Sequence, residues 1–169
     1  DRGYKIMVNN YLIHYGVKGM KWGVRRYQNY DGTLTSAGKI YAKARRMEPK
    51  ITNDIKQIVK KYASLYGLNN RLKTIESISR KQSIGKEIKD SLRYTVISND
   101  KNFVSNYFDI RNELSRKGYE ETSCKNYFRR FESGSAMHKS VQSVYQTPDG
   151  FKFEIQYHTP SSQNVKDSK

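Results

Sequence analysis

The sequence predicts an α+β domain, in which a small mixed or antiparallel sheet is flanked by helices, preceded by a basic, glycine-rich N-terminal arm. Two segments carry apolar residues at helical spacing, and several short segments alternate apolar with polar residues. The first 47 residues also differ from the rest, with ten Lys or Arg, only two acids and six glycines. We therefore expect an arm over residues 1–47 and a domain over residues 48–169.

Composition limits the class of protein. The chain has 169 residues, enough for one domain and an arm, and its net charge is +16. Such an excess of cations favours a polyanionic partner, namely nucleic acid, a nucleotide or an anionic membrane surface, although a solubilising surface is the alternative. The single cysteine, Cys124, excludes an internal disulfide, and three scattered histidines do not suggest a zinc site. No apolar run approaches the roughly 20 residues of a membrane span, and no signal peptide is evident. We therefore expect the protein to fold in a reducing cytoplasm.

The first helix is predicted over residues 49–66. Pro49 suits a first helical position and Gly67 suits the residue just past the end. Its buried face would be the apolar stripe of Ile51, Ile55, Ile58, Val59, Tyr62 and Tyr66. Residues 69–84 then continue as a second helical or mixed segment that carries several cations.

The second half alternates strands and one helix. Residues 92–97 are rich in strand-forming residues, and residues 101–117 predict a helix that begins after Asn99 or Asp100 and stops at Gly118. Residues 120–126 predict another strand. Residues 139–147 and 151–159 predict a hairpin around a Thr-Pro-Asp-Gly turn, and the polar residues after Pro160 are expected to form a tail.

The last strand of this hairpin carries the most informative pattern. Phe151, Phe153, Ile155 and Tyr157 alternate with Lys152, Glu154, Gln156 and His158. A period of two directs the first set to a core and the second set toward an opening. A carboxylate, an amide and an imidazole would then share one face, although an ordinary solvent-exposed face would show the same period.

The sequence of this strand, Phe153–Thr159, resembles the EIQ-x-x-T strand of the RelA/SpoT nucleotide pyrophosphokinase family. Other motifs of that family occur upstream in the same order, in residues 71–81, 90–95, 125–128 and 138–142. The resemblance covers residues 68–159, about half of the chain. It implies the family's synthetase fold and the transfer of pyrophosphate from ATP to a ribose 3′-hydroxyl, with Mg²⁺ bridging phosphate oxygens.

The same resemblance implies roles for individual residues. It assigns Asp90 and Glu154 to Mg²⁺ binding and catalysis, with support from Gln156. The residues implied to hold ATP are Arg71, Lys73, Ser77, Arg80, Lys81 and Arg93. Those implied at the acceptor are Tyr127, His138, Lys139 and His158. Each has a structural alternative: Asp90 pairing with Lys89 or Arg93, the cations forming a solvated helix face, and Glu154 pairing with Lys152.

The sequence departs from the family pattern at two places. The glycine of the motif at residues 90–95 is absent, and the tyrosine that stacks on a guanine acceptor has no match before Ser140. The missing tyrosine, with the net charge of +16, favours an RNA acceptor such as a tRNA 3′ end in place of GDP or GTP. The second half also resembles toxin-like domains of phage minor capsid and polymorphic toxin proteins.

The arm resembles an element of phage and prophage structural proteins, H-x-G-x-K-G-x-K-W-G-x-R-R-Y-Q. Trp22, Arg25 and Arg26 could stack on and pair with nucleic acid, or Trp22 could pack into the domain. The resemblance implies a location in the bacterial cytoplasm or the phage virion, with phage virion proteins or DNA as further partners. The alternative to an enzyme is therefore a non-catalytic, virion-associated structural or nucleic-acid-binding protein that retains the fold.

Overall fold

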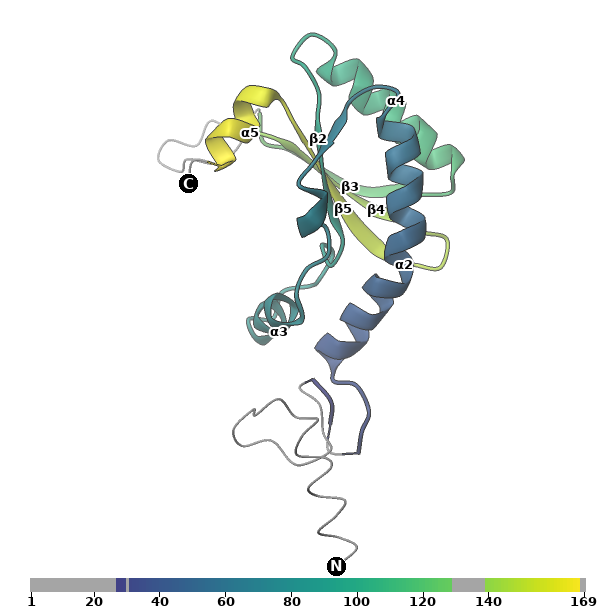
Figure 1. Cartoon of the computed structure of the whole chain (residues 1–169), viewed down its shortest axis with the longest axis vertical. Helices are drawn as coiled ribbons and strands as arrows, with labels where there is room; N and C mark the ends of the chain where they lie inside the picture. The colour runs from purple at the N-terminus through teal and green to yellow at the C-terminus, as the bar shows by residue number, and fades with distance from the viewer. Residues whose placement is uncertain (1–26, 30, 129–138, 168–169) are drawn as a thin grey trace, which may run out of the picture.

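The computed structural model of the chain describes residues 27–29, 31–128 and 139–167. Over these ranges a central sheet carries two long helices on one face, and two shorter helices stand at opposite ends of the other face (Figure 1). The elements are α2 (Ser36–Val59), β1 (Ser64–Tyr66), η1 (Leu68–Asn70), α3 (Ile75–Ser83), β2 (Arg93–Ile97), α4 (Phe103–Arg116), β3 (Glu120–Asn126), β4 (Val141–Gln146), β5 (Lys152–His158) and α5 (Pro160–Asp167). In the part of the chain that the structure describes, none of these helices is long and apolar enough to cross a membrane.

The sheet is mixed, which confirms the predicted fold class. Its five strands run in the order β1-β2-β5-β4-β3, and only β2 and β5 pair in parallel. The predicted hairpin is confirmed by β4 and β5, whose turn closes with a hydrogen bond from the Gly150 N–H to the Thr147 carbonyl. Gly150 has φ of +82°, a conformation that favours glycine.

The core lies between the sheet and the pair α2 and α4. Phe153, Ile155 and Tyr157 on β5 are buried, as their alternation predicts. The Phe153 ring packs edge-on against Tyr94 and Tyr119, with ring centres 6.3 and 5.5 Å apart. This packing fixes which face of β5 is buried, and therefore which face presents its polar side chains.

Helix α2 begins thirteen residues before the predicted start, so the prediction that Pro49 opens the helix is wrong. The Thr35 side chain accepts a hydrogen bond from the Gly38 N–H and caps the helix instead, and the buried side chains of Ala37 and Ala44 extend its apolar face. Pro49 lies inside the helix, whose axis bends about midway (Figure 1). The helix runs through the position between residues 47 and 48, at which the sequence predicts the boundary between arm and domain.

The structure also differs from the prediction at the end of the first helix and after Pro160. Residues 64–66 form β1, which pairs with Thr95–Ile97, because the chain turns away after α2 ends at Val59. The predicted tail after Pro160 is the helix α5. Thr159 and Ser162 cap it reciprocally, each backbone N–H donating to the other's hydroxyl, at 3.0 and 3.4 Å.

Candidate active site

A cavity of about 430 Å³ lies where the segment before α3 meets the start of β2. Residues 71–73 pair with residues 91–93: the Lys73 N–H donates to the Ser91 carbonyl at 2.9 Å, and the Arg93 N–H donates to the Arg71 carbonyl at 2.8 Å. This short ladder brings together side chains from two motifs that are about 20 residues apart in sequence. The lining residues are Asn69, Asn70, Arg71, Leu72, Lys73, Thr74, Ser77, Arg80, Asp90 and Arg93.

The cavity is suited to a polyanion because four of its lining side chains are cationic, namely those of Arg71, Lys73, Arg80 and Arg93, against one carboxylate. The first turn of α3 also faces it. Thr74 caps that helix by accepting from the Ser77 N–H at 3.3 Å, and both residues line the cavity. The positive end of the helix therefore adds to the field of the side chains.

Arg71 is held in place by the core helix α2. Its Nε donates to Glu48 and its Nη1 donates to the Leu68 carbonyl at 2.7 Å. Burial would raise the pKa of Glu48, but hydrogen bonds from Arg71 and Thr52 outweigh it and hold the pKa below the ordinary range. The guanidinium is thus fixed at the wall of the cavity by a carboxylate of α2.

Asp90 joins two of the predicted phosphate-binding lysines. Lys73 Nζ lies 2.6 Å from one carboxylate oxygen and Lys81 Nζ lies 2.8 Å from the other, and the Asp90 side chain is 12% exposed. Burial would raise the pKa of Asp90, but these two hydrogen bonds outweigh it and lower the pKa. Asp90 pairs with neither Lys89 nor Arg93 here; Lys89 pairs instead with Glu87 at 3.0 Å.

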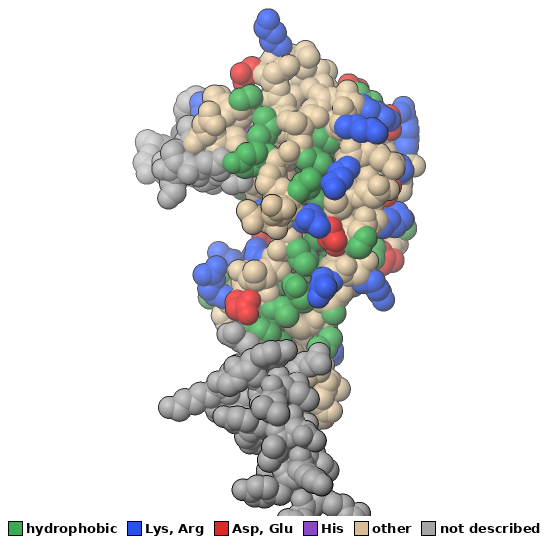
Figure 2. Space-filling model, viewed as in Figure 1, with side chains coloured by type: hydrophobic (Ala, Val, Ile, Leu, Met, Phe, Trp, Pro, Cys, Tyr) green, Lys and Arg blue, Asp and Glu red, His purple; other side chains and the backbone are tan. Residues whose placement is uncertain are grey.

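Glu154 stands on the sheet beside this cavity but does not line it. It lies opposite Arg93 in the parallel pairing of β2 with β5, so both side chains leave the same face. The Gln156 amide donates to the Glu154 carboxylate at 2.6 Å. Lys152, the alternative partner for Glu154, is instead 3.2 Å from Glu87. The face that carries Glu154 is hollowed between α3 and α5 (Figure 2).

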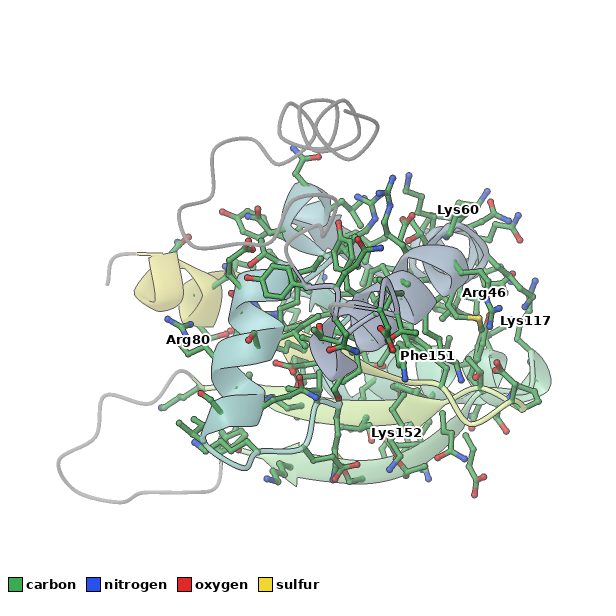
Figure 3. All side chains as sticks on the ribbon, turned by 90° about the horizontal axis from the view of Figure 1, so that it is seen from below. Arg46, Lys60, Arg80, Lys117, Phe151 and Lys152 are labelled. Carbon is green, nitrogen blue, oxygen red and sulfur yellow. The ribbon has the colours of Figure 1, made fainter. Side chains whose placement is uncertain are left out.

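The structure thus brings together five of the six residues predicted to hold ATP, while the sixth, Lys81, contacts Asp90 from α3. The Arg80 side chain points toward the side on which α5 lies (Figure 3). Sequence patterns did not identify Asn69, Asn70 and Thr74 as lining residues. Thr74 could have been found, because a threonine before a helical stripe is a typical cap.

Three of the predicted acceptor residues, Tyr127, Lys139 and His158, are described, and none of them lines this cavity. Tyr127 and Lys139 flank the start of β4, where the Tyr127 N–H donates to the Ser140 carbonyl. The prediction that His158 faces the opening is wrong: it is 1% exposed beneath α5, with Nδ1 3.2 Å from the Ser162 hydroxyl. His138, Trp22, Arg25 and Arg26 lie outside the described residues.

The two carboxylates differ in how well they fit a magnesium ion. An ATP-bound Mg²⁺ takes most ligands from phosphates and water and needs one or two carboxylates. Glu154 meets this need, whereas each oxygen of Asp90 already accepts a hydrogen bond from a lysine. Within residues 27–29, 31–128 and 139–167, no three His, Cys, Asp or Glu side chains are placed to form a cage.

The fold is similar to that of small alarmone synthetases of known structure. The chain is similar to the small alarmone synthetase 2 of Bacillus subtilis, with a TM-score of 0.52 and 17% identity over 77% of this chain and 73% of that one. It is similarly close to small alarmone synthetase 1 of Bacillus subtilis bound to its product pppGpp, with a TM-score of 0.52 and 15% identity over 73% of this chain and 74% of that one.

A third similar structure is the type VI effector Tas1 in complex with its immunity protein, with a TM-score of 0.51 and 22% identity. The match covers 73% of this chain and 61% of Tas1, so this chain spans less than two thirds of that protein. Residues 5–29 match a family of unknown function, DUF7211. A search among curated proteins found no match.

Proposed function

We propose that this chain is a transferase that moves pyrophosphate from ATP to a ribose 3′-hydroxyl of a nucleotide or of an RNA end. The observation that carries the proposal is the convergence of Arg71, Lys73, Arg80 and Arg93 on one cavity next to Glu154. The similar structures support it, because they include synthetases of an alarmone. The effector Tas1 among them supports a toxin as the biological role, and the arm motif supports a phage or prophage source.

In the proposed reaction, the cations of the cavity bind the β- and γ-phosphates of ATP. The acceptor oxygen attacks the β-phosphorus, the bond from that phosphorus to the oxygen of the α-phosphate breaks, and AMP leaves. Glu154 takes the proton of the acceptor hydroxyl. When bound, Mg²⁺ would be held by Glu154 and the phosphates, and it would neutralise charge that develops on the oxygens.

The resting contacts of Asp90 suggest how the cations reach the phosphates. Lys73 and Lys81 rest on its carboxylate at 2.6 and 2.8 Å. A polyphosphate offers these ammonium groups more charge than one carboxylate does, so either lysine can move to it while Asp90 holds the other. Release of one oxygen would also let Asp90 serve as the second metal ligand that the family resemblance implies.

The test is transfer of label from γ-³²P-ATP with Mg²⁺ to separate pools of GDP, GTP, AMP, ADP, ATP and total tRNA. Release of AMP rather than ADP distinguishes transfer of pyrophosphate from transfer of a single phosphate. We expect Glu154→Gln to abolish transfer and Glu120→Gln, an exposed carboxylate on the edge strand β3, to retain it. Absence of transfer to every pool by the folded protein would favour the non-catalytic, virion-associated role instead.

A further inference from the structure

Helix α2 presents a row of cations to solvent on the side away from the core. Lys39, Lys43, Arg46, Lys50 and Lys60, the last at the helix cap, follow at spacings of four, three, four and ten residues. These intervals keep the side chains on one face, and 21 residues of helix make the row about 31 Å long. We call these five residues the α2 ridge.

One ridge cation has an acidic neighbour outside α2: Lys43 Nζ lies 3.9 Å from a carboxylate oxygen of the half-exposed Asp149. The two acids of α2 itself do not neutralise the ridge, because both are largely buried and already paired. Glu48 pairs with Arg71, and its side chain is 17% exposed. Asp54 is 10% exposed and is shared by Lys50 and Lys117, at 3.2 and 3.1 Å. One negative charge between two cations leaves that point of the ridge positive.

The other long helix shows that this is not the general surface of the protein. On α4, Arg111 pairs with Glu121 at 2.8 Å and Arg116 pairs with Glu113 at 3.4 Å, and Asp109 is exposed beside them. A surface that only solubilises a domain interleaves both signs in this way. A row of one sign on a helix is instead typical of a surface that binds a polyanion.

The ridge is rigid and lies apart from the ATP cavity. Ile51, Ile55 and Ile58 anchor the opposite side of α2 in the core. Arg46 and Lys60 project from the side of the molecule opposite α5, where Lys117 also lies, whereas Arg80 of the cavity points the other way (Figure 3). Contact with the ridge therefore leaves the cavity open.

The chemistry of the ridge favours nucleic acid over a membrane. A helix that lies in a membrane interface needs apolar side chains beside its cations. Among the described residues, the exposed large apolar side chains are Leu34, Tyr66, Ile84, Val104 and Phe108, none of them on α2. A row of about 31 Å spans the axial length of about nine base pairs of a duplex, at about 3.4 Å per step.

From these observations we propose that the α2 ridge binds the phosphodiester backbone of a nucleic-acid duplex, at a surface separate from the ATP cavity. Among the described residues no base-reading element accompanies the ridge, so binding by the ridge is expected to be independent of sequence and to weaken as salt rises. RNA and DNA share this chemistry.

The test compares the double variant Arg46→Gln/Lys60→Gln with the control Lys86→Gln/Lys101→Gln, which removes two exposed cations outside the ridge. Each double variant lowers the net charge of the full chain by two, from +16 to +14. Binding of labelled RNA and DNA duplexes of about twenty base pairs, long enough to cover the ridge, is measured by fluorescence anisotropy over a range of salt. Circular dichroism checks that each variant is folded.

We expect the ridge double to bind duplex about tenfold more weakly and to lose about two units of salt slope, while the control changes little. Binding of both duplexes, or of either one, supports the proposal. Binding of only one of them identifies which nucleic acid the ridge binds. Equal loss in both doubles, tighter binding of single strands than of duplexes, or no binding by the wild type would overturn it. Transfer to a mononucleotide acceptor should be unchanged in the ridge double, so failure of the proposed enzyme activity remains a separate result.

Discussion

Arg93 on β2 lies opposite Glu154 on β5 in the parallel register, and the Glu154 N–H donates to the Leu92 carbonyl at 3.0 Å. Arg93 lines the cationic cavity, whereas Glu154 stands on the hollowed face next to it. This pair therefore joins the part of the site suited to ATP phosphates to the part that carries a carboxylate. In the proposed reaction, the bond that breaks and the proton that leaves would both lie near this junction.

Arg80→Gln should weaken ATP binding by about tenfold, because a guanidinium contact with phosphate contributes about 1.5 kcal/mol or more. Arg80 is exposed at the rim of the cavity, so we expect its loss to leave the melting temperature unchanged. Titration with a fluorescent ATP analogue measures the effect. The matched control is Arg116→Gln, on α4. An equal loss of affinity in both variants would mean that net charge, and not the cavity, determines binding.

Asp90→Asn should destabilise the protein by about 1–2 kcal/mol at neutral pH. The change leaves Lys73 and Lys81 without their shared carboxylate, although their partial exposure reduces the cost below that of a fully buried pair. Urea unfolding measures it, with Asp109→Asn on the exposed face of α4 as the control. Tripolyphosphate should stabilise the Asp90 variant more than the wild type, since it supplies the missing anion. If it stabilises both equally, the two lysines do not serve phosphate binding.

Much of the fold and of the cavity was predictable because the deciding signals are local. The helix over residues 101–117 and the hairpin were confirmed, since each has strong periodicity and clear stop residues. The strand predicted at 120–126 was also confirmed. The cationic residues of the 71–81 motif were also expected to converge. Their convergence depends on the ladder between residues 71–73 and 91–93, which the resemblance implies and which periodicity alone does not show.

The errors arise where tertiary contacts override a local pattern. Ser64–Tyr66 continues an apolar stripe in sequence, yet it becomes an edge strand because β2 offers it backbone partners. Pro49 looks like a helix start, but Thr35 supplies a better cap upstream. His158 was expected in the opening because strand alternation cannot show that a helix built from a polar segment would cover it.

Thr159→Ala should cost about 1 kcal/mol of stability by removing the cap of α5. The Thr159 hydroxyl accepts from the Ser162 N–H, and this hydrogen bond is lost in the alanine variant. The hydrogen bond from the Thr159 backbone N–H to the Ser162 hydroxyl does not need the side chain of residue 159 and remains. Thr159→Ser keeps the hydroxyl and is the matched control. Urea unfolding and helical circular dichroism give the measurement. Equal stability of the two variants would show that the hydroxyl of residue 159 does not hold α5.

Asp54 should make stability fall in acid. Burial would raise its pKa, but hydrogen bonds from Tyr119, at 2.6 Å, and from Lys117 and Lys50 outweigh burial and lower the pKa. The folded state thus holds the Asp54 proton less tightly than the unfolded chain does. Its contribution is complete above the ordinary aspartate pKa of about 3.9 and is lost as pH falls through the lower, folded-state value.

Asp54→Asn tests this dependence. At pH 7 we expect a loss of about 1–2 kcal/mol, because the buried Tyr119 hydroxyl loses a charged acceptor while the more exposed lysines lose little. Below about pH 4 the unfolded wild-type chain takes up the Asp54 proton, so the difference between the two proteins should shrink as pH falls toward the lowered pKa of the folded state. Urea unfolding between about pH 3 and 7 measures both, with the exposed Asp100→Asn as the control. A difference that stays constant over this range would mean that packing around residue 54, and not its charge, stabilises the join between α2 and the end of α4.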